Sequence, residues 1–222
     1  MERKYFGMWN DIFLVVLSII FFLLFFLCIK SKHRKPLFIL IVLLISCYGF
    51  FANIYPVENL FYSFPTAERA ADYICSGELL GIVEGTDSAL LVYTDPPNTI
   101  HTVILPRSEG GYHLGSNSTR KEFAENRDTK YFAQLLGCPG REDRYWYISG
   151  PLEGSSVTIA DSSGSAFVTS LRDIGYSSIE EKELFHFISF ALLNPTNDDT
   201  FHVTITDTGE TTDLTFEDVS PG

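Results

Sequence analysis

The chain has 222 residues, 45% of them hydrophobic, and 28 acidic residues outnumber 16 basic ones, for a formal net charge of −12 at pH 7. The imbalance is concentrated after residue 54, where 26 acidic residues face ten basic ones. A region this acidic repels nucleic acid and anionic lipid headgroups, which excludes nucleic-acid binding.

Two apolar segments, residues 12–29 and 37–54, follow an N-terminal segment of residues 1–11. Each contains 18 residues and no Asp, Glu, Lys or Arg. At about 1.5 Å per residue, each would form a helix of roughly 27 Å, close to the thickness of the hydrocarbon layer of a bilayer. The pattern predicts a transmembrane hairpin. Because no charged residue lies inside it, the hairpin is typical of an anchor rather than a transporter or channel.

The loop between the two segments, residues 30–36, determines the predicted orientation. It carries Lys30, Lys32, Arg34 and Lys35. Basic loops stay on the cytoplasmic side, so both termini are predicted to be extracytoplasmic, in a two-helix protein of the cell membrane. A cleaved signal peptide fits less well, because the first segment is long and no small-x-small cleavage site precedes the loop.

Residues 55–139 predict a helix packed on a small antiparallel sheet. Thr66 is a suitable N-cap for a helix that ends at Gly77. The expected strands cover residues 79–83, 89–93, 99–105 and 112–114, with turns at 85–87 and 110–111. Residues 116–137 are polar at first, and Tyr131, Phe132, Leu135 and Leu136 then predict a helix that ends at Gly137. A module boundary is expected at residues 138–140.

Residues 140–222 predict a second, purely β module. Strand-like segments cover residues 145–149, 156–160, 166–171, 184–193, 200–206 and 213–216, separated by turn-forming residues. Such spacing is typical of a β-sandwich of immunoglobulin-like type, although the Cys…Trp…Cys pattern of true immunoglobulin domains is absent. The predicted fold class is therefore membrane-anchored α+β.

Two stretches carry a resemblance to a known class of proteins. They are PTAERAADYICSGELLGIVEGTDSALLVYTD, residues 65–95, and YWYISGPLEGSSVTI, residues 145–159. Over most of residues 63–222 the chain resembles small membrane-anchored proteins of Gram-positive bacteria. The resemblance implies an extracytoplasmic α+β/β ectodomain, and it transfers no functional residues.

The cysteines leave two alternatives open. Cys28 and Cys47 lie in the apolar segments and are read as small apolar fillers. Cys75 and Cys138 lie in the region predicted to be extracytoplasmic, where thiols are oxidised. They form either a disulfide or two separate buried thiols.

Candidate catalytic and metal-binding residues are few. Asp207-Thr208-Gly209 matches the catalytic triplet of aspartic proteases, but only 13 residues follow it, and Asp-x-Gly is also ordinary turn chemistry. The turn is the favoured interpretation. Four histidines in strand-like segments lack the ligand spacing of a zinc site: His101, His113, His186 and His202. No nucleotide-binding or serine-hydrolase motif occurs, and no cofactor is predicted.

These observations predict a non-catalytic binding or interaction ectodomain on a membrane anchor, with a protein or a component of the cell envelope as its partner. One alternative is an accessory subunit of a larger membrane complex. Another is an extracytoplasmic enzyme, either peptidase-like through Asp207 or thiol-based through Cys75 and Cys138.

Overall fold

The computed structural model describes residues 56–217, except 97–98, 116–119, 128–129, 153, 155, 178–181 and 196–199, together with short helical pieces of the apolar segments at 15–16, 19–20, 22–23, 39–40 and 42–44. Among these described residues, no helix is both long and apolar enough to cross a bilayer. The basic loop with Lys30, Lys32, Arg34 and Lys35, and with it the predicted orientation, lies outside the described residues.

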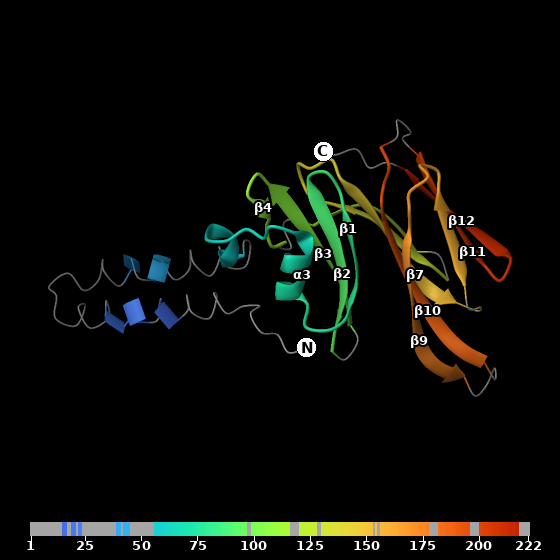
Figure 1. Cartoon of the computed structure of the whole chain (residues 1–222), viewed down its shortest axis with the longest axis horizontal. Helices are drawn as coiled ribbons and strands as arrows, with labels where there is room; N and C mark the ends of the chain where they lie inside the picture. The colour runs from blue at the N-terminus through green and yellow to red at the C-terminus, as the bar shows by residue number, and fades with distance from the viewer. Residues whose placement is uncertain are drawn as a thin grey trace.

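The described part of residues 56–217, here called the β region, is mostly antiparallel sheet (Figure 1). Two short helices come first, η1 (Val57–Leu60) and α3 (Ala67–Ile74). The strands of the first sheet follow, in the order β1-β2-β3-β4: β1 (Leu79–Glu84), β2 (Ser88–Asp95), β3 (Thr99–Ser108) and β4 (Gly111–Tyr112).

Two further sheets complete the β region, and one of the three sheets curves into a half-barrel. The second sheet has the order β5-β6-β7-β10-β9: β5 (Lys121–Arg127), β6 (Phe132–Gly137), β7 (Arg144–Leu152), β10 (Lys182–Leu192) and β9 (Val168–Ser177). The third has the order β12-β11-β8: β12 (Glu210–Glu217), β11 (Thr200–Asp207) and β8 (Val157–Asp161).

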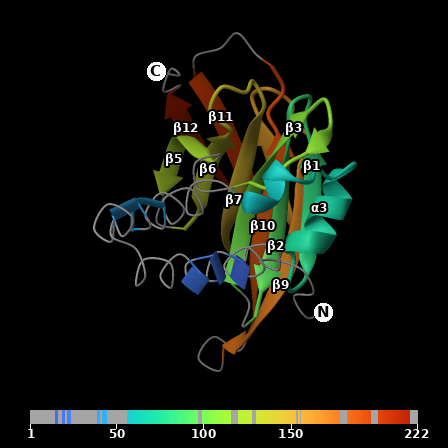
Figure 2. The same ribbon diagram turned by 90° about the vertical axis from the view of Figure 1, so that its left-hand side faces the viewer.

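The three sheets and α3 form four layers, with the second sheet between the other two (Figure 1). Figure 2 looks along this stack, so strands of the first and second sheets overlap in it. Alternate residues of β7 show how the layers meet: Tyr145 and Tyr147 pack toward the first sheet, whereas Trp146 and Ile148 pack toward the third. Because a strand points successive side chains to opposite faces, such a strand is apolar at almost every position.

Helix α3 covers the outer face of the first sheet, as the sequence predicted. The Thr66 side chain accepts a hydrogen bond from the backbone N–H of Arg69 and so caps the first turn. Three of the four buried residues of the helix are alanines, which lets it pack closely on β2 and β3 through Leu91 and Leu105. Its buried residues are Ala67, Ala70, Ala71 and Ile74.

The prediction of a helix ending at Gly137 is wrong. Residues 121–127 and 132–137 form the antiparallel pair β5 and β6, which joins β7 in the second sheet. Strand β6 is buried on both faces: Ala133 and Leu135 pack toward the third sheet, and Leu136 packs toward the first. A short strand buried on both faces gives a continuous apolar run, which periodicity cannot distinguish from a buried helix. The chain thus passes from the first sheet to the second between β4 and β5.

Candidate functional site

Asp207-Thr208-Gly209 forms the tight turn between β11 and β12. Asp207 pairs with Glu210 at the end of the two strands, and Thr208 and Gly209 between them have φ values of 51° and 86°. Two consecutive residues with positive φ are typical of a type I′ hairpin turn, whose twist matches that of the flanking strands. The interpretation of this triplet as a turn is confirmed.

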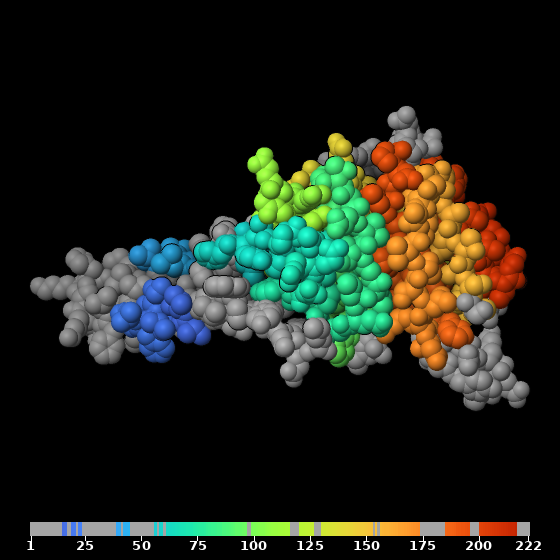
Figure 3. All heavy atoms as spheres, viewed as in Figure 1, coloured from blue at the N-terminus to red at the C-terminus, as the bar shows by residue number. Residues whose placement is uncertain are grey.

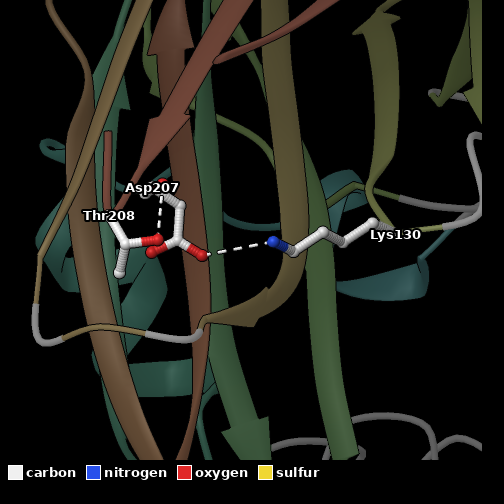
Figure 4. Close-up of polar contacts among 3 residues, drawn as sticks. All are labelled: Lys130, Asp207 and Thr208. Atoms are coloured by element: carbon white, nitrogen blue, oxygen red, sulfur yellow. Dashed lines mark hydrogen bonds and ion pairs between the residues drawn. The ribbon is translucent and has the colours of Figure 1, made fainter. Parts of the chain in front are cut away.

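The carboxylate of Asp207 is fully buried and meets a cation (Figure 4). Lys130 Nζ lies 3.4 Å from Asp207 Oδ2, and the Thr208 hydroxyl donates to the backbone carbonyl of Asp207. Aspartic proteases instead place a second carboxylate beside the first so that the two share one proton. The geometry around Asp207 therefore corresponds to an ion pair between a buried carboxylate and a partly exposed ammonium group.

Cys75 and Cys138 are both free thiols in the structure. Cys75 follows α3 and packs against the cluster between that helix and the first sheet, whereas Cys138 belongs to the cluster between the first and second sheets. Burial, together with nearby Asp95 and Asp72, raises the pKa of Cys75 to about 12. Burial also raises the pKa of Cys138. Both environments disfavour the thiolate, which is the nucleophilic form of cysteine.

The four histidines lie apart from one another. His186 is on β10 and His202 on β11, in different sheets, while His101 stacks on Tyr93 and His113 hydrogen-bonds the Ser108 hydroxyl. Burial, with Arg172 nearby, lowers the pKa of His186. In the part of the chain that the structure describes, no three His, Cys, Asp or Glu side chains come together in a metal-binding arrangement.

A cavity of about 440 Å³ lies where the three sheets meet. The turn between β1 and β2 contributes from the first sheet, β5, β6, β7 and the end of β10 from the second, and β11 from the third. Half of its lining is apolar, with three carboxylates and one guanidinium among the other half. The lining residues are Thr86, Asp87, Phe123, Leu135, Glu142, Asp143, Arg144, Leu192, Leu193, Asn194, Pro195 and Phe201.

Asp143 holds one wall of this cavity together. Its carboxylate accepts hydrogen bonds from three consecutive backbone N–H groups of the β1–β2 turn, those of Thr86 at 3.1 Å, Asp87 at 2.8 Å and Ser88 at 2.8 Å. The Ser88 hydroxyl adds a fourth at 3.1 Å. In return, Asp87 Oδ2 accepts from the backbone N–H of Glu142 at 3.0 Å. This reciprocal set, here called the aspartate clamp, fixes the first sheet to the second.

Two further observations concern the aspartate clamp: the space beside Gly85 and the pKa of Asp143. A Cβ atom on Gly85 would lie 2.3 Å from an Asp143 carboxylate oxygen, so only glycine lets the carboxylate approach the turn. Burial by itself would raise the pKa of Asp143, but hydrogen bonds with Asp87, Thr86 and Ser88 outweigh it and hold that pKa below its usual value. Asp143 therefore remains ionised at neutral pH.

Asp87 differs from Asp143 in how its carboxylate is satisfied. Its Oδ1 atom is buried and makes no hydrogen bond with any residue that the structure describes. A buried acceptor without a donor is unfavourable by about 1–3 kcal/mol. Asp87 also lines the cavity.

Arg144 provides the positive charge in the cavity wall. Its guanidinium carbon lies 3.8 Å from the centre of the Phe123 ring, and its Nη1 donates to the backbone carbonyls of Arg141 and Asp143. These contacts direct the guanidinium toward the aromatic floor and the backbone. Three carboxylates against one guanidinium leave the cavity with a formal charge of −2.

This arrangement suits the binding of a positively charged group better than acid–base chemistry. A carboxyl group that acts as a general acid near neutral pH needs a raised pKa, and the pKa of Asp143 is lowered. The acidic and apolar sides of the cavity match a cationic group on an apolar stem. Sequence reasoning missed this cavity, because its lining comes from separate segments between residues 86 and 201. The one local signal was Gly85 in its turn.

No protein-family model, no curated protein and no solved structure matches this chain.

Proposed function

We propose that this protein is a membrane-anchored, extracytoplasmic binding protein, and that the cavity between its three sheets receives a positively charged group on an apolar stem, such as a lysine side chain of a partner. The observation that carries the proposal is the lining of the cavity, in which the carboxylates of Asp87, Glu142 and Asp143 accompany one guanidinium and an apolar side. An ammonium group supplies the opposite charge, and its apolar stem matches the apolar side of the cavity.

The apolar segments support the anchor. Every side chain described within residues 12–54 is large, apolar and exposed, from Val15 to Leu44, and Phe22 is 68% exposed. Helices whose apolar side chains are not covered by protein are typical of contact with lipid. The basic loop favours an extracytoplasmic β region, in which the second and third sheets form the two halves of an immunoglobulin-like sandwich. Reporter fusions in the loop and at the C-terminus test the orientation; a cytoplasmic C-terminus contradicts it.

The binding test uses the full-length protein in lipid nanodiscs and three matched probes. N-acetyl-lysine amide carries the cation, N-acetyl-norleucine amide is its neutral analogue, and N-acetyl-2-aminoadipate amide is acidic. We expect saturation-transfer NMR to show binding of the lysine probe with a Kd of about 1 mM, because small ligands yield roughly 0.3 kcal/mol per heavy atom. The neutral probe binds more weakly, and the acidic probe does not bind.

The matched variants are Asp87→Asn and Glu109→Gln. Asn retains an oxygen that accepts from the backbone N–H of Glu142 but removes the charge, whereas Glu109 is exposed and does not line the cavity. Asp87→Asn should weaken binding of the lysine probe severalfold, and Glu109→Gln should leave it unchanged. Equal binding of the lysine and norleucine probes contradicts the proposal, as does unchanged binding to Asp87→Asn.

Two other functions make different predictions. If the chain is an accessory subunit of a larger membrane complex, replacing residues 12–54 by an unrelated anchor abolishes its function, whereas a simple tether tolerates the exchange. If the chain is a peptidase, Asp207→Asn abolishes the activity. The pairing of Asp207 with Lys130 disfavours the peptidase, because an aspartic protease places a second carboxylate, and not a cation, beside the first.

A further inference from the structure

Two aromatic side chains stand out on the surface of the β region. Among the described residues after Pro56, five large apolar side chains are exposed: Phe61 at 68%, Tyr62 at 54%, Leu171 at 44%, Leu79 at 42% and Val168 at 42%. The two most exposed are adjacent in sequence, and they are also the two nearest to the second apolar segment. Phe64, two residues after Tyr62, is by contrast buried and belongs to the core.

The chain on either side of these two residues is firmly attached to the first sheet. The Asn59 side chain donates to the backbone carbonyl of Leu114 at 2.9 Å and accepts from its N–H at 2.7 Å, as a backbone partner would. Phe64 and Tyr112 exchange two backbone hydrogen bonds of 2.7 Å. Phe61 and Tyr62 lie between these attachments, and the Tyr62 ring also packs edge-on against the Phe64 ring, with 4.9 Å between their centres. The fold thus presents both rings on a fixed loop.

The length of chain before the loop keeps the two rings near the predicted membrane. Six residues lie between Ile54, the last residue of the second apolar segment, and Phe61, and four of them form the 3₁₀ helix η1. With about 3.5 Å per extended residue and about 2 Å per 3₁₀ residue, Phe61 lies within roughly 20 Å of the end of that segment. Figure 3 shows residues 57–64, in light blue to teal, on the end of the β region that faces the coloured pieces of the apolar segments.

The local composition also suits a lipid surface. Residues 59–66, NLFYSFPT, contain no charged side chain, although residues 55–222 carry 26 acidic residues. An acidic surface is repelled by anionic headgroups, so an uncharged aromatic stretch is the part of this region that can approach a bilayer at low cost. Amphipathic aromatic rings favour the interface between headgroups and acyl chains.

We infer that Phe61 and Tyr62 insert into the interfacial layer of the bilayer and fix the orientation of the β region on the membrane. The inference rests on the membrane anchor of the proposed function and goes beyond it. A tether alone lets the β region rotate freely above the membrane. Two inserted rings, held by Asn59 and Phe64, set its tilt and therefore set where the cavity faces.

The test places a fluorescent reporter at each position. Full-length protein carrying Trp9→Phe is reconstituted into phosphatidylcholine vesicles, and Tyr62→Trp or Phe61→Trp is added. The control is Leu171→Trp on β9, because Leu171 is exposed but distant in sequence from the anchor. The vesicles contain either ordinary lipid or lipid brominated at carbons 6 and 7 of one acyl chain, which quenches tryptophan near the interface. Buried Trp146 gives a constant background.

We expect brominated lipid to reduce the added emission of Tyr62→Trp and Phe61→Trp roughly twofold and to leave Leu171→Trp unchanged, because only the first two positions reach the interface. If the protein floats with the vesicles but neither variant is quenched more than Leu171→Trp, the inference is wrong and the anchor stands. If the protein does not float with the vesicles, the anchor fails and the inference fails with it. Because positions 61 and 62 are tested separately, a disturbance of the loop by one substitution does not decide the result.

Discussion

Asp143 and Asp207 both place a carboxylate inside the β region, one between the first and second sheets and the other at the end of the third. Asp143 is satisfied by neutral donors, three backbone N–H groups and one hydroxyl, all from a single turn. Asp207 meets the ammonium group of Lys130, whose side chain is 26% exposed.

The difference shows two ways of keeping a negative charge inside a protein. Backbone donors are fixed by the fold and cannot move away, so they stabilise the charge only while the two sheets are together. A lysine supplies an opposite charge. Its ammonium group is already well solvated in the unfolded chain and stays partly exposed in the fold, so pairing with Asp207 adds little to the free energy of unfolding. A substitution of Asp143 therefore tests the packing of the first sheet against the second, whereas a substitution of Asp207 tests mainly the turn between β11 and β12.

The largest effect should come from Asp143→Ala. The substitution removes the acceptor of three N–H groups, of which that of Ser88 is buried and those of Thr86 and Asp87 are partly buried. A buried donor left without an acceptor is unfavourable by about 1–3 kcal/mol, so we expect a loss of roughly 3 kcal/mol in the free energy of unfolding. Urea unfolding at pH 7, followed by tryptophan fluorescence, measures it. Glu109→Ala, at an exposed acidic position, is the control and should be nearly neutral. If Asp143→Ala lowers the free energy of unfolding no more than Glu109→Ala does, the aspartate clamp does not stabilise the fold.

Gly85→Ala tests the same contact from the opposite side. The added Cβ would lie 2.3 Å from the Asp143 carboxylate, so the turn or the aspartate must move and hydrogen bonds are lost. We expect about 2 kcal/mol of destabilisation, in the range for overpacking a tight site. Gly110→Ala is the matched control, because its Cβ would meet only the Ser63 side chain, at 3.2 Å or more. Similar unfolding curves for both variants would argue against the close approach.

Lys130→Met should have a smaller effect. The substitution keeps the aliphatic stem but leaves the buried Asp207 carboxylate without this cation, and we expect a loss of about 1–2 kcal/mol, reduced from the value for a fully buried pair by the exposure of Lys130. Adding Asp207→Asn should recover part of the loss, because no charge then needs compensation. A double variant as unstable as the sum of the single ones would contradict the ion pair as the source of the effect.

The pH dependence distinguishes Asp143 further. Its folded-state pKa lies below the unfolded value, so the ionised group stabilises the fold fully above the unfolded pKa of about 3.9, and this contribution disappears as the pH falls through the folded pKa. The Asp143→Asn variant lacks this stabilising contribution at every pH. Urea unfolding between pH 7 and pH 3 should therefore show the stabilities of wild type and variant converging below about pH 4. A constant difference would mean that the charge of Asp143 is not involved.

The smallest perturbation is chemical labelling of the cysteines. Because burial raises the pKa of Cys75 to about 12 and raises that of Cys138, both remain protonated near pH 7.5, and iodoacetamide should label them slowly in the folded protein. After unfolding without reductant, peptide mapping should show both labelled. Failure to label the pair until reductant is added would reveal a disulfide instead of the two thiols.

Local patterns in the sequence predicted much of the outer part of the fold and little of its centre. Strand β11 alternates buried and exposed residues, which gives a clear strand signal, and the positive-φ turn at Thr208-Gly209 bounds it. Strand β6 is buried from Ala133 to Gly137 on both faces, so its sequence carries no alternation, and it was assigned to a helix. Burial on both faces is a property of the assembled layers and leaves no periodic trace in a short segment.

The cavity and its aspartate clamp could not be predicted from the sequence, for a related reason. Asp143 occurs in an ordinary polar stretch, REDR, and nothing nearby marks it, because its four donors lie more than 50 residues earlier in the chain. Asp207, by contrast, belongs to a recognisable triplet and attracted a catalytic hypothesis, although its geometry is that of a turn. A carboxylate whose donors come from a distant turn can be recognised only once the two sheets are in contact.

The position of the second sheet between two others also governs how the β region should lose its structure. Each neighbouring layer completes a core that the second sheet shares, so removing the first or the third sheet exposes one whole apolar face of the second. A partly unfolded form would then be unstable and prone to aggregate through this exposed apolar face. We expect the β region to unfold in a single cooperative transition, and the second sheet to show the slowest hydrogen exchange among the described strands of that region.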